Sequence, residues 1–208
     1  MKRTITILGM GPTAYERRVG MASHVEGEVW SLNNAYDFYK DSGITFDRFF
    51  ELHKWDYLKT WNPGHDKDHF RCLSELGCDV WVTEPLPSIH NQKIYPHIDL
   101  FRHFKTNYFL GSPSLMLALA IYEHDMGKEV DQIKVFGVDT SDPSHSQQRQ
   151  SWTFWLSKAM DRGIVISGTG ADCFAEHEKD AGLRGLREEI GDVINNLNSE
   201  IQTPPQGE

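Results

Sequence analysis

The chain has 208 residues, a formal net charge of -9 at pH 7 and a hydrophobic fraction of 39%. Its six Trp, seven Tyr and eleven Phe residues exclude an intrinsically disordered chain and predict a globular core. No run of about 18 apolar residues is present, so neither a membrane span nor a membrane partner is expected. The acidic charge disfavours general binding of duplex nucleic acid, and the three cysteines lack zinc-knuckle spacing. The sequence starts without a signal-peptide cleavage site, so we expect a cytoplasmic protein, either in the cell that produces it or in a host cell.

Six short apolar runs have the length and continuity of parallel strands covered on both faces. Asp47–Leu52 is the weakest of them, and the other five are Thr4–Leu8, Glu28–Leu32, Asp79–Thr83, Ile133–Val138 and Ile164–Ser167. Helical patterns separate these runs along the chain. The alternation predicts an α/β fold with a Rossmann-like open, mostly parallel sheet and helices on both faces.

Two helices are predicted with start signals. The first covers Ser112–Met126, with Ser112 as its N-cap and Pro113 at the first helical position. It is apolar nearly all round, which is typical of a buried central helix. The second follows a capping box of Ser144 and Gln147, and its apolar stripe, expected to cover the sheet, consists of Trp152, Trp155, Leu156, Ala159 and Met160.

The predicted sheet occupies one Rossmann-like nucleotide-binding domain, residues 1–175, in which the polar segment Trp55–Phe70 is interpreted as a loop insertion. A C-terminal helix is expected over residues 176–201, because apolar residues recur there at steps of three and four, and residues 202–208 form a disordered tail. The apolar seam of this helix either docks on the parent domain or pairs with a second copy, which would give a homo-oligomer.

Glycines follow the first strand directly, in the segment Gly9-Met10-Gly11-Pro12-Thr13. Such a turn lets the backbone approach a ligand, and the next helix would offer N–H groups and the positive end of its dipole to a phosphate. The third glycine of the dinucleotide fingerprint is missing, which disfavours ordinary NAD binding. A purely architectural strand-to-helix turn is the alternative.

Asn33 and Asn34 follow the second strand, at the edge where open α/β sheets bind ligands. Their amides would bind a base, a ribose or a sugar hydroxyl, unless they serve only as a turn or a helix cap.

The segment from Asp139 to Arg149 connects a buried strand to the second predicted helix. Gln148 and Arg149 are expected on the side of the first helical turn that faces the core. Polar groups there need partners, either a buried salt bridge, for example with Asp139, or a ligand across the cleft. His145, at the helix start, is a candidate acid or base because imidazole titrates near neutral pH.

Weaker candidates lie in the middle of the chain. Glu51 and His53 follow the third strand and either face the cleft or are ordinary solvent-exposed residues. His65, His69 and Cys72 share one face if their segment is helical, and their atoms suit zinc, but no fourth ligand is evident.

The motifs GMGPT, SLNNAY, GSPSLMLALAIYE and IKVFGVD resemble those of the bacterial sialyltransferases with a G-N-G-P-S opening and of pterin-pyrophosphokinase-like proteins. Met10 stands where the sialyltransferases have Asn. The segment His145–Ile164 also looks like that of uncharacterised bacteriophage proteins with a Q-R pair before an aromatic helix. The resemblance implies a Rossmann-like fold and a nucleotide site made of Gly9, Gly11, Pro12, Thr13, Asn33, Ser112 and Ser114.

These observations lead to a nucleotide-sugar-dependent, glycosyltransferase-like enzyme as the first hypothesis. Arg149 would neutralise phosphate charge, and His145 or Asp139 would deprotonate an acceptor hydroxyl. This scheme requires no cofactor. If Asp139 and Asp142 both face the ligand, a bound Mg²⁺ would instead favour pyrophosphoryl transfer or nucleotide hydrolysis. A non-catalytic phage protein that sequesters a nucleotide and an assembly protein without a ligand are the other two classes.

Overall fold

The computed structural model describes residues 3–11, 14, 21–61, 66–138 and 146–168, all within the first of two compact units, Met1–Ala171. The predicted domain boundary at residue 175, the C-terminal helix and the tail lie outside the described residues. In the described part of the chain, no helix has both the length and the apolar character needed to cross a bilayer.

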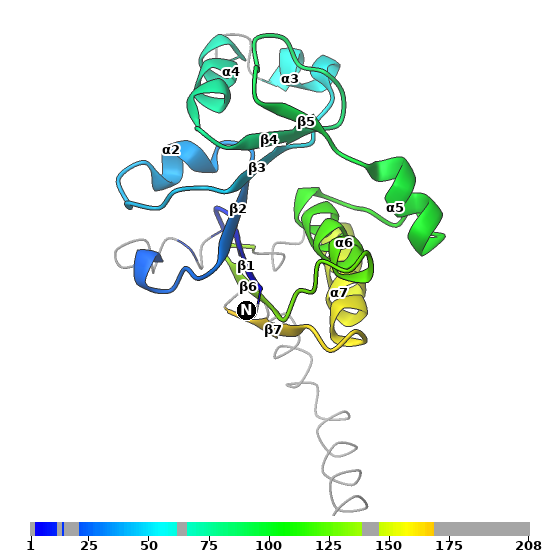
Figure 1. Cartoon of the computed structure of the whole chain (residues 1–208). Helices are drawn as coiled ribbons and strands as arrows, with labels where there is room; N and C mark the ends of the chain where they lie inside the picture. Colours follow the sequence, from blue (N-terminus) through cyan, green and yellow to red (C-terminus); the bar gives the residue numbers. More distant parts are fainter. Residues whose placement is uncertain (1–2, 12–13, 15–20, 62–65, 139–145, 169–208) are drawn as a thin grey trace, which may run out of the picture. The chain divides into compact units, whose positions relative to one another are not determined.

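The described residues form a seven-stranded sheet in which every pair of neighbouring strands is parallel (Figure 1). Its order is β5-β4-β3-β2-β1-β6-β7. The strands are β1 (Thr4–Leu8), β2 (Glu28–Leu32), β3 (Arg48–Glu51), β4 (Asp79–Val82), β5 (Gln92–Ile94), β6 (Gln132–Phe136) and β7 (Val165–Ser167). All six predicted runs are strands, which confirms the α/β fold with an open parallel sheet. The short polar strand β5 was not predicted.

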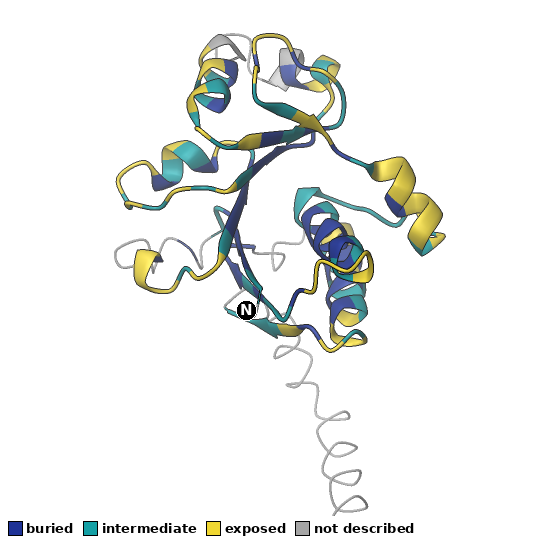
Figure 2. Ribbon diagram, viewed as in Figure 1, coloured by how far each residue is buried: buried dark blue, intermediate teal, exposed yellow. Residues whose placement is uncertain are grey.

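Helices cover both faces of the sheet (Figure 1). One face carries α2 (Ala35–Tyr39), α3 (Trp55–Trp61) and α4 (Asp66–Glu75), and a short 3-10 helix, Met21–Ser23, precedes β2. The other face carries α5 (His97–Phe104), α6 (Ser112–Asp125) and α7 (Ser146–Met160). Figure 2 shows that α6 is largely buried, as its apolar sequence predicted, whereas α5 is mostly exposed.

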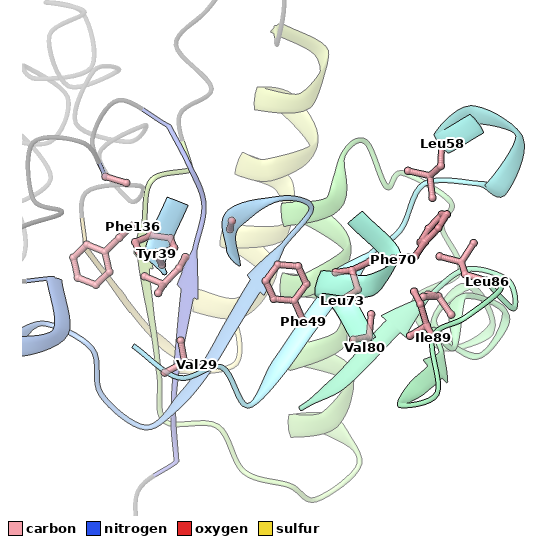
Figure 3. Close-up of a cluster of buried hydrophobic side chains, with 14 of the residues drawn as sticks. Val29, Tyr39, Phe49, Leu58, Phe70, Leu73, Val80, Leu86, Ile89 and Phe136 are labelled. Atoms are coloured by element: carbon pink, nitrogen blue, oxygen red, sulfur yellow. The ribbon is translucent and has the colours of Figure 1, made fainter. Parts of the chain in front are cut away.

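The central strands β1, β2 and β3 are buried on both faces, which their continuous apolar runs predicted. On one face, Val29, Phe49 and Val80 of neighbouring strands belong to the same core cluster as Phe70 and Leu73 of α4 (Figure 3). The intervening strand residues face the opposite layer, where α6 contacts β1, β2 and β3. The fully buried residues among them include Ile5, Ile7, Trp30 and Phe50.

Three local predictions were wrong. Trp55–Phe70 is not a loop insertion: α3 begins at Trp55 and α4 at Asp66, because Leu58 and Phe70 join the buried core and hold both helices on the sheet. Ser112 is the first residue of α6, and Gly111 takes the N-cap position with φ 86°, a conformation in which a serine would be strained. The buried stripe of α7 ends before Met160, which is 55% exposed.

A charged cluster at the amino ends of the strands was not anticipated from the sequence. Glu123, near the end of α6, is only 5% exposed and accepts hydrogen bonds from Arg3, before β1, and Arg48, at the start of β3. Glu28 forms ion pairs with the same two guanidinium groups. The cluster attaches the C-terminal end of α6 to this edge, so its N-terminal end lies at the carboxyl edge of the sheet.

Candidate functional site

The strand order reverses between β1 and β6. From β1 the chain builds outward through β2, β3 and β4 to β5, and it then returns to place β6 on the other side of β1. In open α/β sheets, ligands bind in the crevice at the carboxyl ends of the two strands where the order reverses. Gly9 and Gly11 follow β1 at this point, and Gly137 follows β6. The glycine motif therefore lies where a ligand site of this fold is expected.

The two glycine turns are in direct contact. The N–H of Gly9 donates to the carbonyl of Phe136 at 2.8 Å, and that of Gly11 donates to the carbonyl of Gly137 at 2.6 Å. A Cβ atom on Gly9 would lie 2.2 Å from the oxygen of Gly137, so no larger residue fits. The hydroxyl of Tyr39 donates to the carbonyl of Gly9 at 2.8 Å. These contacts show that packing of the two turns against each other is enough to require glycine here. Contact of the turn with phosphate stays a prediction.

Asn33 stands directly after β2, beside the end of β3. Its N–H donates to the carbonyl of Phe50 at 2.9 Å, and its φ of 55° is unusual for a residue other than glycine. Its Oδ1 is buried and has no hydrogen-bond partner among the described residues. A buried acceptor without a donor costs free energy, and strained residues occur often at ligand sites. Asn33 is therefore a candidate ligand-binding residue, whereas Asn34 is exposed at the N-cap of α2 without a side-chain cap bond.

The N-terminal ends of α6 and α7 lie at this same edge, because each helix leads into a strand parallel to β1. In the first turn of α6, Ser112 is half-buried and Ser114 is buried. Gln148 is exposed, so its predicted core-facing position was wrong. Its Oε1 lies 3.2 Å from where a Cβ on Gly111 would stand, because the first turn of α7 packs beside the start of α6. Arg149 is half-buried.

Four predicted site residues, Pro12, Thr13, Asp139 and His145, lie outside the described residues, as does Ser144 of the predicted capping box. Their assignment to phosphate binding and to proton transfer stays a prediction.

A buried carboxylate joins two histidines at the carboxyl end of β3. Glu51 is fully buried, and its Oε1 lies 2.7 Å from Nδ1 of His53 and accepts the backbone N–H of the same residue at 3.2 Å. Its Oε2 lies 2.9 Å from Nε2 of His69, on α4. The Nδ1 of His69 lies 2.8 Å from the hydroxyl of Tyr36, on α2. We refer to Tyr36, His69, Glu51 and His53 as the Glu51 network.

The charge of Glu51 determines the direction of its own hydrogen bonds to His53 and His69. Burial acts to raise the pKa of its carboxyl, but the hydrogen bonds from His53 and His69 hold that pKa below the ordinary value. An ionised carboxylate only accepts, so Nδ1–H of His53 and Nε2–H of His69 are the donors. In the neutral form of His69, Nδ1 would then accept from Tyr36, whose hydroxyl stays protonated because burial raises its pKa. In neutral His53 the remaining nitrogen, Nε2, is the basic one.

Ring contacts hold the two histidines in place. The ring of His53 stacks on Tyr57 of α3, with 5.0 Å between centroids, and the ring of His69 packs against Tyr36 at 5.6 Å. Tyr36 in turn packs on Phe49 of β3 at 6.0 Å. The side chain of His53 is 31% exposed and that of His69 is 11% exposed. His53 is therefore the histidine of the network that a substrate in solution can reach more readily.

The structure thus brings together Glu51, His53 and His69, which were weaker candidates in the sequence. Hydrogen bonds join them, and among the described residues no group of three or more His, Cys, Asp or Glu side chains is arranged to hold a metal ion. His65 lies outside the described residues, and Cys72 is half-buried. Tyr36 was missed. Its only sequence signal is an aromatic residue soon after the Asn pair, which is too common to identify a partner of His69.

No family model matches the chain, and no curated protein matches it. Among solved structures, the chain is similar to thiamine pyrophosphokinase from Bacillus subtilis, with a TM-score of 0.42 and 16% sequence identity. The match covers 79% of this chain and 59% of the other, so it spans less than two thirds of that protein. A likeness of this degree carries no argument about activity, and the functional argument rests on the residues themselves.

Proposed function

We propose that this protein is a transferase that moves a group from a nucleotide-activated donor to an acceptor hydroxyl, with His53 as its general acid–base residue. The observation that carries the proposal is the fully buried Glu51 carboxylate, which holds the partly exposed His53 at the carboxyl edge of the sheet. A buried carboxylate that orients an imidazole is the usual support for a histidine that transfers protons.

The proton and electron balance follows from the tautomers of the network. Nε2 of His53 takes the proton of the acceptor hydroxyl while Glu51 holds Nδ1–H and stabilises the imidazolium. The acceptor oxygen forms a bond to the donor carbon or phosphorus. The bond from that atom to the nucleotide phosphate oxygen breaks, and the phosphate leaves with the electron pair. General base catalysis of this kind contributes about 10²- to 10⁴-fold in rate.

The donor is proposed to lie at the crevice between β1 and β6. The N-terminal ends of α6 and α7 converge on this edge, and both helix dipoles and Arg149 suit phosphate there. The Oδ1 of Asn33, which has no hydrogen-bond partner among the described residues, would accept a hydrogen bond from a ribose hydroxyl or a base amino group. Nucleotide sugars are the first donors to consider because of the resemblance to sialyltransferases. A nucleoside triphosphate, with Mg²⁺ and pyrophosphoryl transfer, is the second.

The test is a turnover assay with the full chain. CMP-, UDP- and GDP-sugars, and ATP with Mg²⁺, are each incubated with a mixture of methyl glycosides, and release of the nucleotide product is followed by ³¹P NMR. We expect turnover with one donor class, and a loss of about 10²-fold or more in kcat for His53→Gln.

His103→Gln is the matched control, because His103 also lies 2.7 Å from a carboxylate, that of Asp125, and is also 31% exposed, but belongs to α5. It should leave kcat unchanged. Binding of a nucleotide without turnover would contradict the proposal and favour a nucleotide-sequestering protein. Equal loss in both variants would contradict the role of His53.

A further inference from the structure

We propose that His69 is a positioning residue for the proposed reaction, because it holds the buried Glu51 carboxylate so that Oε1 faces His53. Nε2 of His69 lies 2.9 Å from Oε2 of Glu51, while Oε1 of Glu51 lies 2.7 Å from Nδ1 of His53. The two histidines thus bind different oxygens of one fully buried carboxylate. This inference rests on the proposed function, since it names the residue that orients the support of the acid–base histidine.

The place of His69 is fixed by its helix. Phe70 and Leu73 of α4 belong to the core cluster that packs on β3 and β4 (Figure 3). His69 directly precedes Phe70, and its ring lies 5.8 Å from the ring of Phe70 and 5.6 Å from that of Tyr36. The Tyr36 hydroxyl lies 2.8 Å from Nδ1 of His69. Contacts on the ring and at the opposite nitrogen therefore aim Nε2 at Glu51.

The role of His69 differs from that of His53. The side chain of His69 is 11% exposed, against 31% for His53, and it lies on a helix that packs into the core. An Nε2–H group donates to an ionised carboxylate whether the imidazole ring is neutral or protonated, so this bond does not depend on the charge of His69. His69 therefore acts on the reaction through Glu51 and not through contact with the substrate.

Glu51 needs both histidines because it is buried. Burial acts to raise the pKa of its carboxyl, and the hydrogen bonds from His53 and His69 hold that pKa below the ordinary value of 4.5. Without His69, Oε2 would lose the donor that the structure shows, and the pKa of Glu51 would rise. The carboxylate would also be able to turn about its side-chain bonds, so Oε1 would hold His53 less firmly.

Other titratable side chains reach the network from neighbouring elements. Burial raises the pKa of Tyr36, on α2, and Cys72, on α4, adds to that shift. The Tyr36 hydroxyl therefore keeps its proton over the whole range in which a carboxyl titrates. Tyr57, on α3, stacks on the ring of His53. Glu84, in the loop after β4, accepts the backbone N–H at the start of α3.

The test compares two variants that each keep one of the two hydrogen bonds of His69. The side-chain amide of Gln ends near the position of Nε2, and that of Asn near the position of Nδ1. His69→Gln therefore keeps the bond to Glu51, and His69→Asn keeps the bond to Tyr36. On the full chain without substrate, the Glu51 carboxyl is followed by ¹³C NMR between pH 7 and pH 2. We expect it to titrate about one pH unit higher in His69→Asn than in His69→Gln.

The turnover assay supplies the second readout. We expect kcat of His69→Gln to stay within about threefold of the unmodified protein and that of His69→Asn to fall about tenfold, with the KM of both substrates unchanged. His69→Met removes both hydrogen bonds at a similar side-chain size and should behave as His69→Asn does. It takes the place of His69→Asn in the comparison if that variant does not fold.

His103→Asn is the matched control, because Nε2 of His103 also lies 2.7 Å from a carboxylate, that of Asp125, but His103 belongs to α5. It should change neither the titration of Glu51 nor kcat. Equal titration of Glu51 in His69→Gln and His69→Asn, or an equal loss of kcat in both, would overturn the inference. Absence of turnover in the unmodified protein would refute the proposed function, whereas the NMR comparison uses no substrate and would still show whether His69 holds Glu51.

Discussion

The turns after β1 and β6 can lie against each other only because Gly9 has no side chain. The cost of adding one comes from the fixed backbone of Gly137, since the carbonyl cannot rotate away without breaking its bond from Gly11. We expect Gly9→Ala to lower the free energy of unfolding by about 3 kcal/mol in urea titrations. Gly43→Ala is the control. Its φ is 72°, but its added methyl group meets no atom within 4 Å, so it should cost only about 1 kcal/mol. Equal losses of stability in the two variants would show that the contact between Gly9 and Gly137 is not what excludes a side chain from the turn.

The direction of the hydrogen bonds in the Glu51 network can be measured without any substrate. With Glu51 ionised, a neutral His69 would carry its proton on Nε2 and leave Nδ1 bare for Tyr36. Long-range ¹H–¹⁵N correlation spectra should show this tautomer. Tyr36→Phe should shift the Nδ1 resonance and cost about 1 kcal/mol of stability, because the buried nitrogen loses its donor. A proton on Nδ1 of His69 in the unmodified protein would contradict the assigned order.

The elements with strong local patterns were predictable, and the contacts between elements were not. Continuous apolar runs identified β1 and β6, and the apolar sequence of Ser112–Met126 identified α6 with its buried position. The strand β5 has only the three residues QKI and is held by pairing with β4, so its own sequence carries little signal. The approach of His69 to Glu51 depends on α4 packing over β3, which sequence spacing alone does not specify.

Helix α6 also shows how one buried charge can orient an apolar element. Burial acts to raise the pKa of Glu123, but hydrogen bonds from Arg48 and Arg3 hold it at about 2, against an ordinary value of 4.5. Its contribution to stability is therefore complete above pH 4.5 and is lost as the pH falls towards 2.

We expect Glu123→Gln to lower the free energy of unfolding by about 3 kcal/mol at pH 7, because Arg3 and Arg48 lose their buried partner. The difference from the unmodified protein should narrow at pH 3, where the glutamate of the unfolded chain is already protonated. Urea unfolding of both proteins at both pH values measures this difference in the free energy of unfolding. Asp99→Asn, at an exposed ion pair, should cost less than about 0.5 kcal/mol at either pH. A constant difference for Glu123→Gln would show that its charge does not stabilise the fold.

On the scale of the whole unit, the amino edge and the carboxyl edge of the sheet carry different kinds of residues. The amino edge is closed by ion pairs among Arg3, Glu28, Arg48 and Glu123, whereas the carboxyl edge carries the glycine turns, Asn33 and the Glu51 network. This division predicts which edge of the sheet a bound nucleotide protects from hydrogen exchange.

Hydrogen exchange followed by mass spectrometry, with and without the nucleotide that gives turnover, should show slower exchange in peptides that contain residues 9–11, 33–34 and 111–114. Peptides over 26–29 and 123–128, at the amino edge, should be unchanged, because no ligand contacts them. Protection spread equally over both edges would indicate general stiffening of the sheet and would contradict a nucleotide site at its carboxyl edge.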